Sequence, residues 1–295
     1  MHYSVKSLIF ILVIIALFTF SCGCTDGEEN GAPGNGDDIK VTVTILPQEQ
    51  FVERIGGDNI DVFVLVPPGA SPHSYEPTPS DLAQVSDSDV YVIMGSGIEF
   101  ELLWLDKIKE LNPGITIINS SENVDLVYSD SEGGPDPHIW LSPRNAITIA
   151  GNIRDGLSAF DPFETEYYTE NTASYIDRLE ELDSEISNEI GASGVEVIMV
   201  THPAWTYFAR DYGLRQIAIS EGGKEPTPAG IKELVDEALE NNVSTVFVSP
   251  EFSTTDAGVI ADEIDGKVAI VDPLAEDYLE NMKAVSKAFS GGDQS

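Results

Sequence analysis

The segment PFETEYYTENTASYIDRLEELDSEISNEI, residues 162–190, predicts one long helix in the middle of the chain. After Pro162 it contains no glycine or proline, so nothing in its composition interrupts the helix. At about 1.5 Å per residue the helix would span roughly 40 Å, which is enough to connect two separate lobes. Apolar residues recur mostly at steps of three and four, the period of one helix face. They are Tyr168, Tyr175, Ile176, Leu179, Leu182, Ile186 and Ile190.

On either side of this helix, short β-branched runs alternate with helical runs. Before it, strands are expected at 41–46, 60–66, 90–95 and 115–119. After it, strands are expected at 195–200, 214–220, 244–249 and 267–272. Uninterrupted apolar strands between helices are typical of parallel sheets covered on both faces. The sequence therefore predicts an α/β fold with two lobes, 39–161 and 193–290, joined by one rigid helix over 162–192.

The N-terminus predicts export. A short basic start precedes the apolar run SLIFILVIIALFTF (7–20) and two cysteines, which together indicate a signal peptide over residues 1–24. An uncleaved membrane anchor is the alternative, because the run approaches spanning length. Cys22 and Cys24 are the only cysteines, so a disulfide framework is excluded.

Either cysteine could accept a lipid, which would anchor the protein to the outer face of the cell membrane. Gly23 before Cys24 favours Cys24 slightly. Residues 25–38 lack apolar periodicity and predict a flexible linker.

Charge limits the partners. The chain has 15 Lys and Arg against 51 Asp and Glu, a net charge of -36, and the acids are spread along its whole length. Such a surface repels nucleic acid and attracts cations without specifying a site. A solvated acidic surface suited to a salty medium is the simplest explanation.

Three histidines lie beyond the signal, and each has a proline beside it that stiffens the backbone. His73 and His202 lie in loops that follow predicted strands, and His138 lies in a loop before a helical stretch. Ligands of parallel sheets bind beyond the carboxyl ends of the strands. Asp272 also follows a strand, and Glu251 is a competing carboxylate after the neighbouring strand.

Taken singly, each of these residues has an ordinary explanation as a loop residue, turn former or helix cap. Taken together, three imidazoles and one carboxylate make a four-coordinate shell that suits Zn²⁺. Mn²⁺ prefers more oxygen ligands. The sequence has no HExxH pairing, which argues against an exported zinc hydrolase without excluding one. Aromatic residues near the histidines are expected to pack in the core; they are Trp140, Trp205 and Tyr207.

Six motifs, in this order, resemble the solute-binding proteins of zinc and manganese ABC transporters. They are GASPHSYEPTPSDL (69–82), DPHIWLSP (136–143), THPAWTYFARDYGL (201–214), EGGKEPTP (221–228), VFVSPEFST (246–254) and DPLAEDYLENM (272–282). The resemblance covers the folded chain from about Val41 to Phe289 and implies two α/β lobes, a rigid linking helix and a metal in the cleft between the lobes.

The resemblance implies that His73, His138, His202 and Asp272 are metal ligands, with Glu251 or water as alternatives to Asp272. Manganese-type relatives commonly have glutamate at the position of His202, so this chain is expected to prefer Zn²⁺ over Mn²⁺. The motif EGGKEPTP also resembles the zinc branch.

One segment departs from the family pattern. Many zinc-binding relatives have a histidine-rich loop where this chain has YSDSEGGPD (128–136). A solvated turn is the expected structure there, and weak cation capture by Asp130, Glu132 and Asp136 is the alternative.

As a whole, the resemblance predicts a non-enzymatic, lipid-anchored and monomeric receptor. It would deliver zinc to a membrane permease driven by an ATPase. A manganese receptor, a zinc hydrolase and an adhesion protein on the same fold are the alternatives.

Overall fold

The computed structural model describes residues 38–129, 134–220, 224 and 226–292. The predicted signal peptide with Cys22 and Cys24 lies outside the described residues, as does the linker up to residue 37. So do Asp130, Glu132 and half of the EGGKEPTP motif. No helix within the described ranges is long and apolar enough to cross a membrane.

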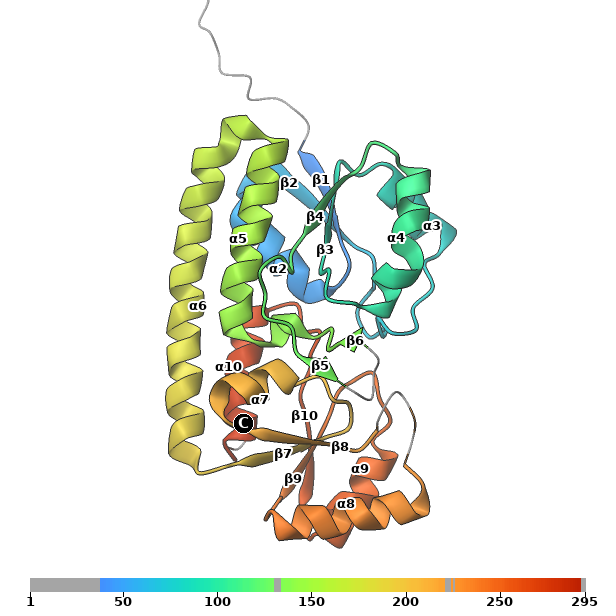
Figure 1. Cartoon of the computed structure of the whole chain (residues 1–295), viewed down its shortest axis with the longest axis vertical. Helices are drawn as coiled ribbons and strands as arrows, with labels where there is room; N and C mark the ends of the chain where they lie inside the picture. The colour runs from blue at the N-terminus through green and yellow to red at the C-terminus, as the bar shows by residue number, and fades with distance from the viewer. Residues whose placement is uncertain (1–37, 130–133, 221–223, 225, 293–295) are drawn as a thin grey trace, which may run out of the picture. The chain divides into compact units, whose positions relative to one another are not determined.

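The N-terminal lobe contains a four-stranded parallel sheet in the order β2-β1-β3-β4 (Figure 1). Its strands are β1 (Ile39–Val43), β2 (Ile60–Val64), β3 (Val90–Ile93) and β4 (Thr116–Asn119). They are connected by α2 (Leu46–Gly56), η3 (Gly57–Asn59), α3 (Pro79–Ser86) and α4 (Glu99–Leu111). Every residue of β3 is buried, as expected for a central strand covered on both faces.

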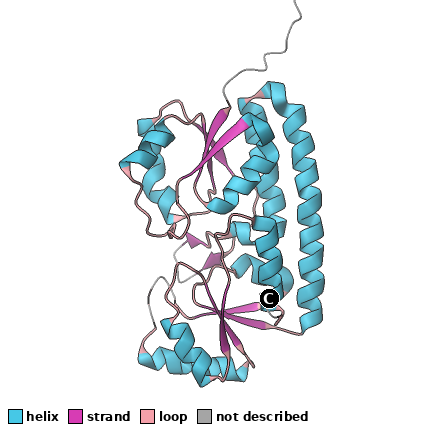
Figure 2. Cartoon of the chain, turned by 180° about the vertical axis from the view of Figure 1, so that it is seen from behind, coloured by secondary structure: helices cyan, strands magenta, loops and turns pink. Residues whose placement is uncertain are grey.

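The C-terminal lobe repeats this arrangement with the strand order β10-β9-β7-β8, again all parallel. Its strands are β7 (Val197–Val200), β8 (Arg215–Ala218), β9 (Thr245–Val248) and β10 (Lys267–Ile270). Its helices are α7 (Thr206–Tyr212), α8 (Pro228–Glu240), α9 (Thr255–Glu263) and α10 (Tyr278–Phe289). Seen from behind, helices flank both faces of each sheet (Figure 2). The α/β prediction is confirmed, with strands a few residues shorter than expected.

The long helix predicted at the middle of the chain is confirmed as α6 (Thr165–Ser193), which follows a short turn, η5 (Pro162–Glu164). It ends at Gly194, whose positive φ of 72° suits a glycine after a helix. The helix runs alongside both lobes (Figure 1). Its buried face is close to the predicted one and comprises Tyr168, Thr172, Tyr175, Leu179, Leu182, Ile186 and Ile190.

The helical stretch expected after His138 is α5 (Pro143–Phe160), which packs beside α6 as its antiparallel neighbour (Figure 1). Ser142 caps its start by accepting a hydrogen bond from the Asn145 backbone N–H. Gly156 brings α5 against the first sheet, because a Cβ there would lie 2.6 Å from the Ile118 side chain. The connection between the lobes is therefore one member of a helix pair.

One hydrophobic core extends from the first sheet to one face of the second. Trp140 is buried within it, and its indole Nε1 donates a hydrogen bond of 2.8 Å to the Pro273 carbonyl. The Tyr278 hydroxyl donates to the Trp140 carbonyl, also at 2.8 Å. A separate, smaller cluster covers the other face of the second sheet. The predicted packing role of Trp140 is confirmed, and it ties the two lobes together.

A two-stranded antiparallel ribbon precedes His138. It pairs β5 (Tyr128–Ser129) with β6 (Gly134–Pro135). Residues 130–133 between these strands are outside the described ranges, so the expected solvated turn stays a prediction.

Candidate metal centre

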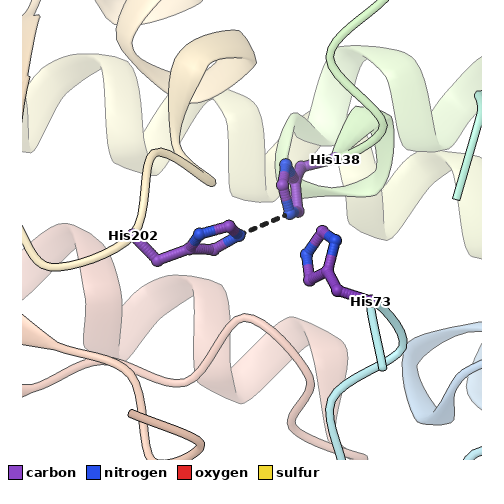
Figure 3. Close-up of side chains that lie close together, drawn as sticks. All are labelled: His73, His138 and His202. Carbon is purple, nitrogen blue, oxygen red and sulfur yellow. Dashed lines mark hydrogen bonds between the residues drawn. The ribbon is translucent and has the colours of Figure 1, made fainter. Parts of the chain in front are cut away.

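Three loops from different parts of the chain bring His73, His138 and His202 together (Figure 3). His73 comes from the loop between β2 and α3, and His138 directly precedes the short helix η4 (Ile139–Leu141). His202 follows the end of β7 by two residues. One nitrogen from each ring lies within 4.8 Å of the other two. The structure thus brings together all three histidines that the sequence predicts as ligands.

The spacing within this cluster matches the ligand shell of one ion. His138 Nε2 and His202 Nε2 are 3.1 Å apart. Two nitrogens bound tetrahedrally at about 2.0–2.1 Å from zinc would be roughly 3.3–3.4 Å apart. The His73 ring centre lies 5.4 Å from that of His138 and 4.9 Å from that of His202. A small contraction or expansion of the cluster is therefore enough to accommodate a metal ion.

His138 is the most enclosed of the three and is held by Asp136. Asp136 Oδ1 accepts hydrogen bonds of 2.9 Å from both His138 Nδ1 and the His138 backbone N–H. The two side chains are only 5% and 6% exposed. Burial would raise the pKa of Asp136, but the hydrogen bond and charge interaction with His138 outweigh it and lower that pKa. The carboxylate accepts only, so His138 carries its proton on Nδ1 and offers the lone pair of Nε2 to the cluster.

His73 lies nearer to solvent and has its own carboxylate. Its Nδ1 lies 2.7 Å from Glu99 Oε2 on the first residue of α4. Burial acts to raise the pKa of Glu99, but the hydrogen bond and charge of His73, the Glu99 backbone N–H and the charge of His138 together outweigh it and lower that pKa. Glu99 was not predicted as a site residue, because 26 positions separate it from His73 and no local motif joins them.

His202 is held differently, by an aromatic ring. Its imidazole stacks on Phe252 with ring centres 4.9 Å apart and an angle of 22° between the planes. Burial lowers the pKa of His202 to about 2, and the neighbouring imidazoles of His138 and His73 add to the shift. The ring is therefore neutral near pH 7. Because His138 Nε2 is an acceptor, His202 Nε2 is the donor in the hydrogen bond between them (dashed line in Figure 3).

The two candidate carboxylates are placed differently from the histidines. Neither Asp272 nor Glu251 belongs to the cluster of ligand atoms within 4.8 Å, among the residues that the structure describes. Asp272 Oδ1 accepts a 2.7 Å hydrogen bond from the Leu274 backbone N–H. Glu251 lines the cavity at the histidines, and its buried Oε2 has no hydrogen-bonding partner among the described residues. Burial raises the pKa of both carboxyls, and the charge of Asp272 adds to the shift of Glu251.

The cavity at the cluster is small, with a volume of about 10 Å³. That is close to the space needed by a single water molecule. Its walls combine the three imidazoles with Glu251 and two aromatic rings, Trp140 and Phe252. Phe252 was not predicted as a site residue either, although it lies in the motif VFVSPEFST (246–254).

Two sheets with the same strand order, a linking helix and convergent loops define a two-lobed α/β binding protein. The family described as the periplasmic component A of the zinc-uptake complex, ZnuA, matches residues 41–292, and the chain belongs to this family. The family resemblance seen in the sequence motifs is thereby confirmed.

Two relatives and one solved structure illustrate the similarity. The chain is 32% identical to the manganese-binding lipoprotein MntA of Halalkalibacterium halodurans, over 96% of this chain and 97% of that protein. It is 30% identical to the high-affinity zinc uptake system protein ZnuA of Bacillus subtilis, over 90% and 88%. A crystal structure of ZnuA superimposes with a TM-score of 0.84 and 40% identity, over 87% of this chain and 99% of that one.

Proposed function

We propose that this protein is the extracytoplasmic solute-binding component of a zinc ABC transporter. It captures Zn²⁺ through His73, His138 and His202 and delivers the ion to a membrane permease powered by an ATPase. The convergence of three imidazoles in one cavity is the observation that carries the proposal. Family membership supports it, since the family description names zinc uptake.

The donor set supports zinc over manganese. Imidazole nitrogen suits Zn²⁺, whereas Mn²⁺ prefers carboxylate and water oxygens. We assign the fourth position to a carboxylate, with Asp272 as the residue expected from the family pattern. Asp272 would have to turn towards the cluster, since its Oδ1 bonds the Leu274 backbone. Glu251, which already lines the cavity, is the alternative.

The protein acts by binding alone. Membership of a family described by zinc uptake supports a cargo role for the ion rather than hydrolysis. The protein works as a monomer, anchored to the outer face of the membrane through Cys24 or Cys22. Mass spectrometry of the mature N-terminus would identify the lipid-bearing cysteine, and a soluble, unlipidated product would contradict the anchor.

Equilibrium dialysis against equal concentrations of Zn²⁺ and Mn²⁺, followed by elemental mass spectrometry, tests the metal assignment. One zinc per chain with little manganese is expected. Preferential retention of manganese would assign the chain the cargo named for the Halalkalibacterium relative. Retention of neither ion would contradict a role in metal binding.

A further inference from the structure

Glu99 lies on the first residue of α4, where it meets the loop that carries His73. Its Oε2 is 2.7 Å from His73 Nδ1, and the side chains of His73 and Glu99 are 26% and 48% exposed. A second bond joins the same two segments next to this contact. The Phe100 backbone N–H donates to the Pro72 carbonyl at 3.2 Å. The start of α4 and the His73 loop are therefore fixed to each other by both backbone and side chain.

The start of α4 is itself firmly held. Ile98 and Phe100, on either side of Glu99, are each 1% exposed, and Glu101 is buried. Glu101 accepts hydrogen bonds from the Met94 and Gly95 backbone N–H groups at 2.7 and 2.8 Å. A carboxylate projecting from so fixed a backbone has a well-defined position. Glu99 is thus suited to orient a neighbouring ring.

The chemistry of the contact sets the proton on the ring. An ionised carboxylate accepts hydrogen bonds and donates none, so His73 must carry its proton on Nδ1. The lone pair of Nε2 then becomes the donor atom available to a metal. Histidine ligands of metals usually donate their other ring N–H to a carboxylate, a carbonyl or water, which fixes the tautomer and the ring orientation.

We propose that Glu99 is a positioning residue of the metal centre, which holds His73 in the Nδ1–H tautomer and aims its Nε2 at the cluster. The proposal rests on the proposed metal-binding function. It gives His73 the same kind of support that Asp136 gives to His138. The difference is that the Glu99 contact is half-exposed, while the Asp136 contact is buried.

The test compares three variants with the wild type. Glu99→Ala removes the acceptor, and Glu99→Gln keeps an amide oxygen that can still accept from Nδ1–H. Glu110→Gln is the matched control, because it removes the same charge from an exposed position on the same helix. Two quantities are measured: the tautomer of His73 in metal-free protein, by nitrogen-15 NMR of the imidazole, and the zinc affinity, by competition with a chelator.

In the wild type, Glu99→Gln and Glu110→Gln, His73 should be protonated on Nδ1. Glu99→Ala should show a mixture of both tautomers. Its zinc affinity should fall about ten- to hundredfold, the usual loss for removing a group that supports a metal ligand. The zinc affinity of Glu99→Gln should lie between those of Glu99→Ala and the wild type, and that of Glu110→Gln should equal the wild-type affinity.

An unchanged His73 tautomer together with wild-type zinc affinity in Glu99→Ala would overturn the inference. A purely structural role for Glu99 would lower thermal stability without moving the tautomer, and that result would also overturn it. The tautomer is measured without metal. Loss of the proposed function, seen as a wild type that binds no zinc, is therefore distinct from failure of the Glu99 assignment.

Discussion

The two lobes share one strand order but hold their histidines in different ways. In each sheet the first strand lies between the second and the third, as β2-β1-β3-β4 and β8-β7-β9-β10. His73 and His138 each form a hydrogen bond between Nδ1 and a carboxylate. Both carboxylates, Glu99 and Asp136, also come from the part of the chain before α6. His202, from the C-terminal lobe, rests on the face of Phe252 instead.

The two types of contact orient the imidazoles for a metal ion to different degrees. Carboxylates fix both the direction and the tautomer of the first two imidazoles, so their Nε2 lone pairs are ready. Stacking restrains the plane of His202 but leaves its proton on Nε2, where it bonds His138. Binding a metal through Nε2 would therefore require His202 to change tautomer, with its proton on Nδ1 instead. His73 and His138 therefore already have the tautomer and orientation that a metal ligand needs. His202 has to change its tautomer.

The largest effect is expected from His138→Ala. This change removes the most enclosed imidazole and leaves the buried Asp136 carboxylate with the backbone N–H of residue 138 but without the imidazole. Zinc affinity should fall by more than about a hundredfold, beyond the loss typical for a supporting residue. Chelator competition measures the affinity, and circular dichroism of the metal-free variant shows whether it is folded. A folded variant with wild-type affinity would remove His138 from the centre.

Zinc itself should stabilise the protein by an amount that depends on His202. At one hundred times the dissociation constant, binding contributes about 2.7 kcal/mol to the free energy of unfolding. For a chain of this size the melting temperature should rise by about 5–10 °C, and a chelator should reverse the rise. In His202→Gln at the same zinc concentration the rise should be much smaller. An equal rise in both proteins would mean that His202 is not a ligand.

A pH series on metal-free protein should reveal the buried state of His202. Burial holds its pKa near 2 in the folded protein, whereas the unfolded chain takes up the proton near pH 6.5. Below that pH the unfolded state binds more protons, so stability is lost as the pH falls. Between pH 7.5 and 5.5 the wild type should lose about 1.4 kcal/mol relative to His202→Gln.

Urea unfolding at the two pH values measures this difference. The comparison with His202→Gln removes the effect of the many surface acids, which both proteins share. Parallel losses in the two proteins would show that the ring is protonated in the folded state.

The smallest effect is expected from Phe252→Leu, which keeps an apolar contact but removes the stacked ring. Aromatic pairs contribute about 0.5–1.5 kcal/mol beyond the burial of their area. Zinc affinity measured by chelator competition should therefore fall about two- to tenfold, less than in Glu99→Ala. A loss as large as that of Glu99→Ala would show that stacking prepares His202 as firmly as a carboxylate prepares His73.

Local patterns in the sequence predict much of the fold. The unbroken face of α6 and the alternating strands required only the spacing of apolar residues. Helix α5 was harder to delimit, because it contains Gly151 and Gly156, which weaken a helical pattern. Gly156 is needed for contact with Ile118, and that is a tertiary requirement no local pattern reveals.

The candidate site could be predicted from the sequence in part: the histidines could be, but the choice of carboxylate and the supporting residue could not. Strand ends placed His73 and His202 where ligands bind, because ligands of parallel sheets lie beyond the carboxyl ends of the strands. The sequence could not show whether Asp272 or Glu251 lies nearer the histidines, since that depends on the order of the strands in the sheet. Asp272 follows the edge strand β10, whereas Glu251 follows β9, which lies beside the strand that leads to His202. The contact between Glu99 and His73 could not be predicted, because it depends on where the start of α4 lies in the folded protein.

The core that runs from the first sheet to one face of the second has a consequence for how the molecule comes apart. Residues of α10 and β7 belong to the same hydrophobic cluster as β1 and β3. Gln50 in the first lobe bonds the Asp277 side chain and the Leu279 backbone in the second. Neither sheet can lose its packing without exposing the other, so heating should produce one cooperative calorimetric transition rather than two. The lobes share a strand order and differ in how they hold their histidines, but they form a single unit of unfolding.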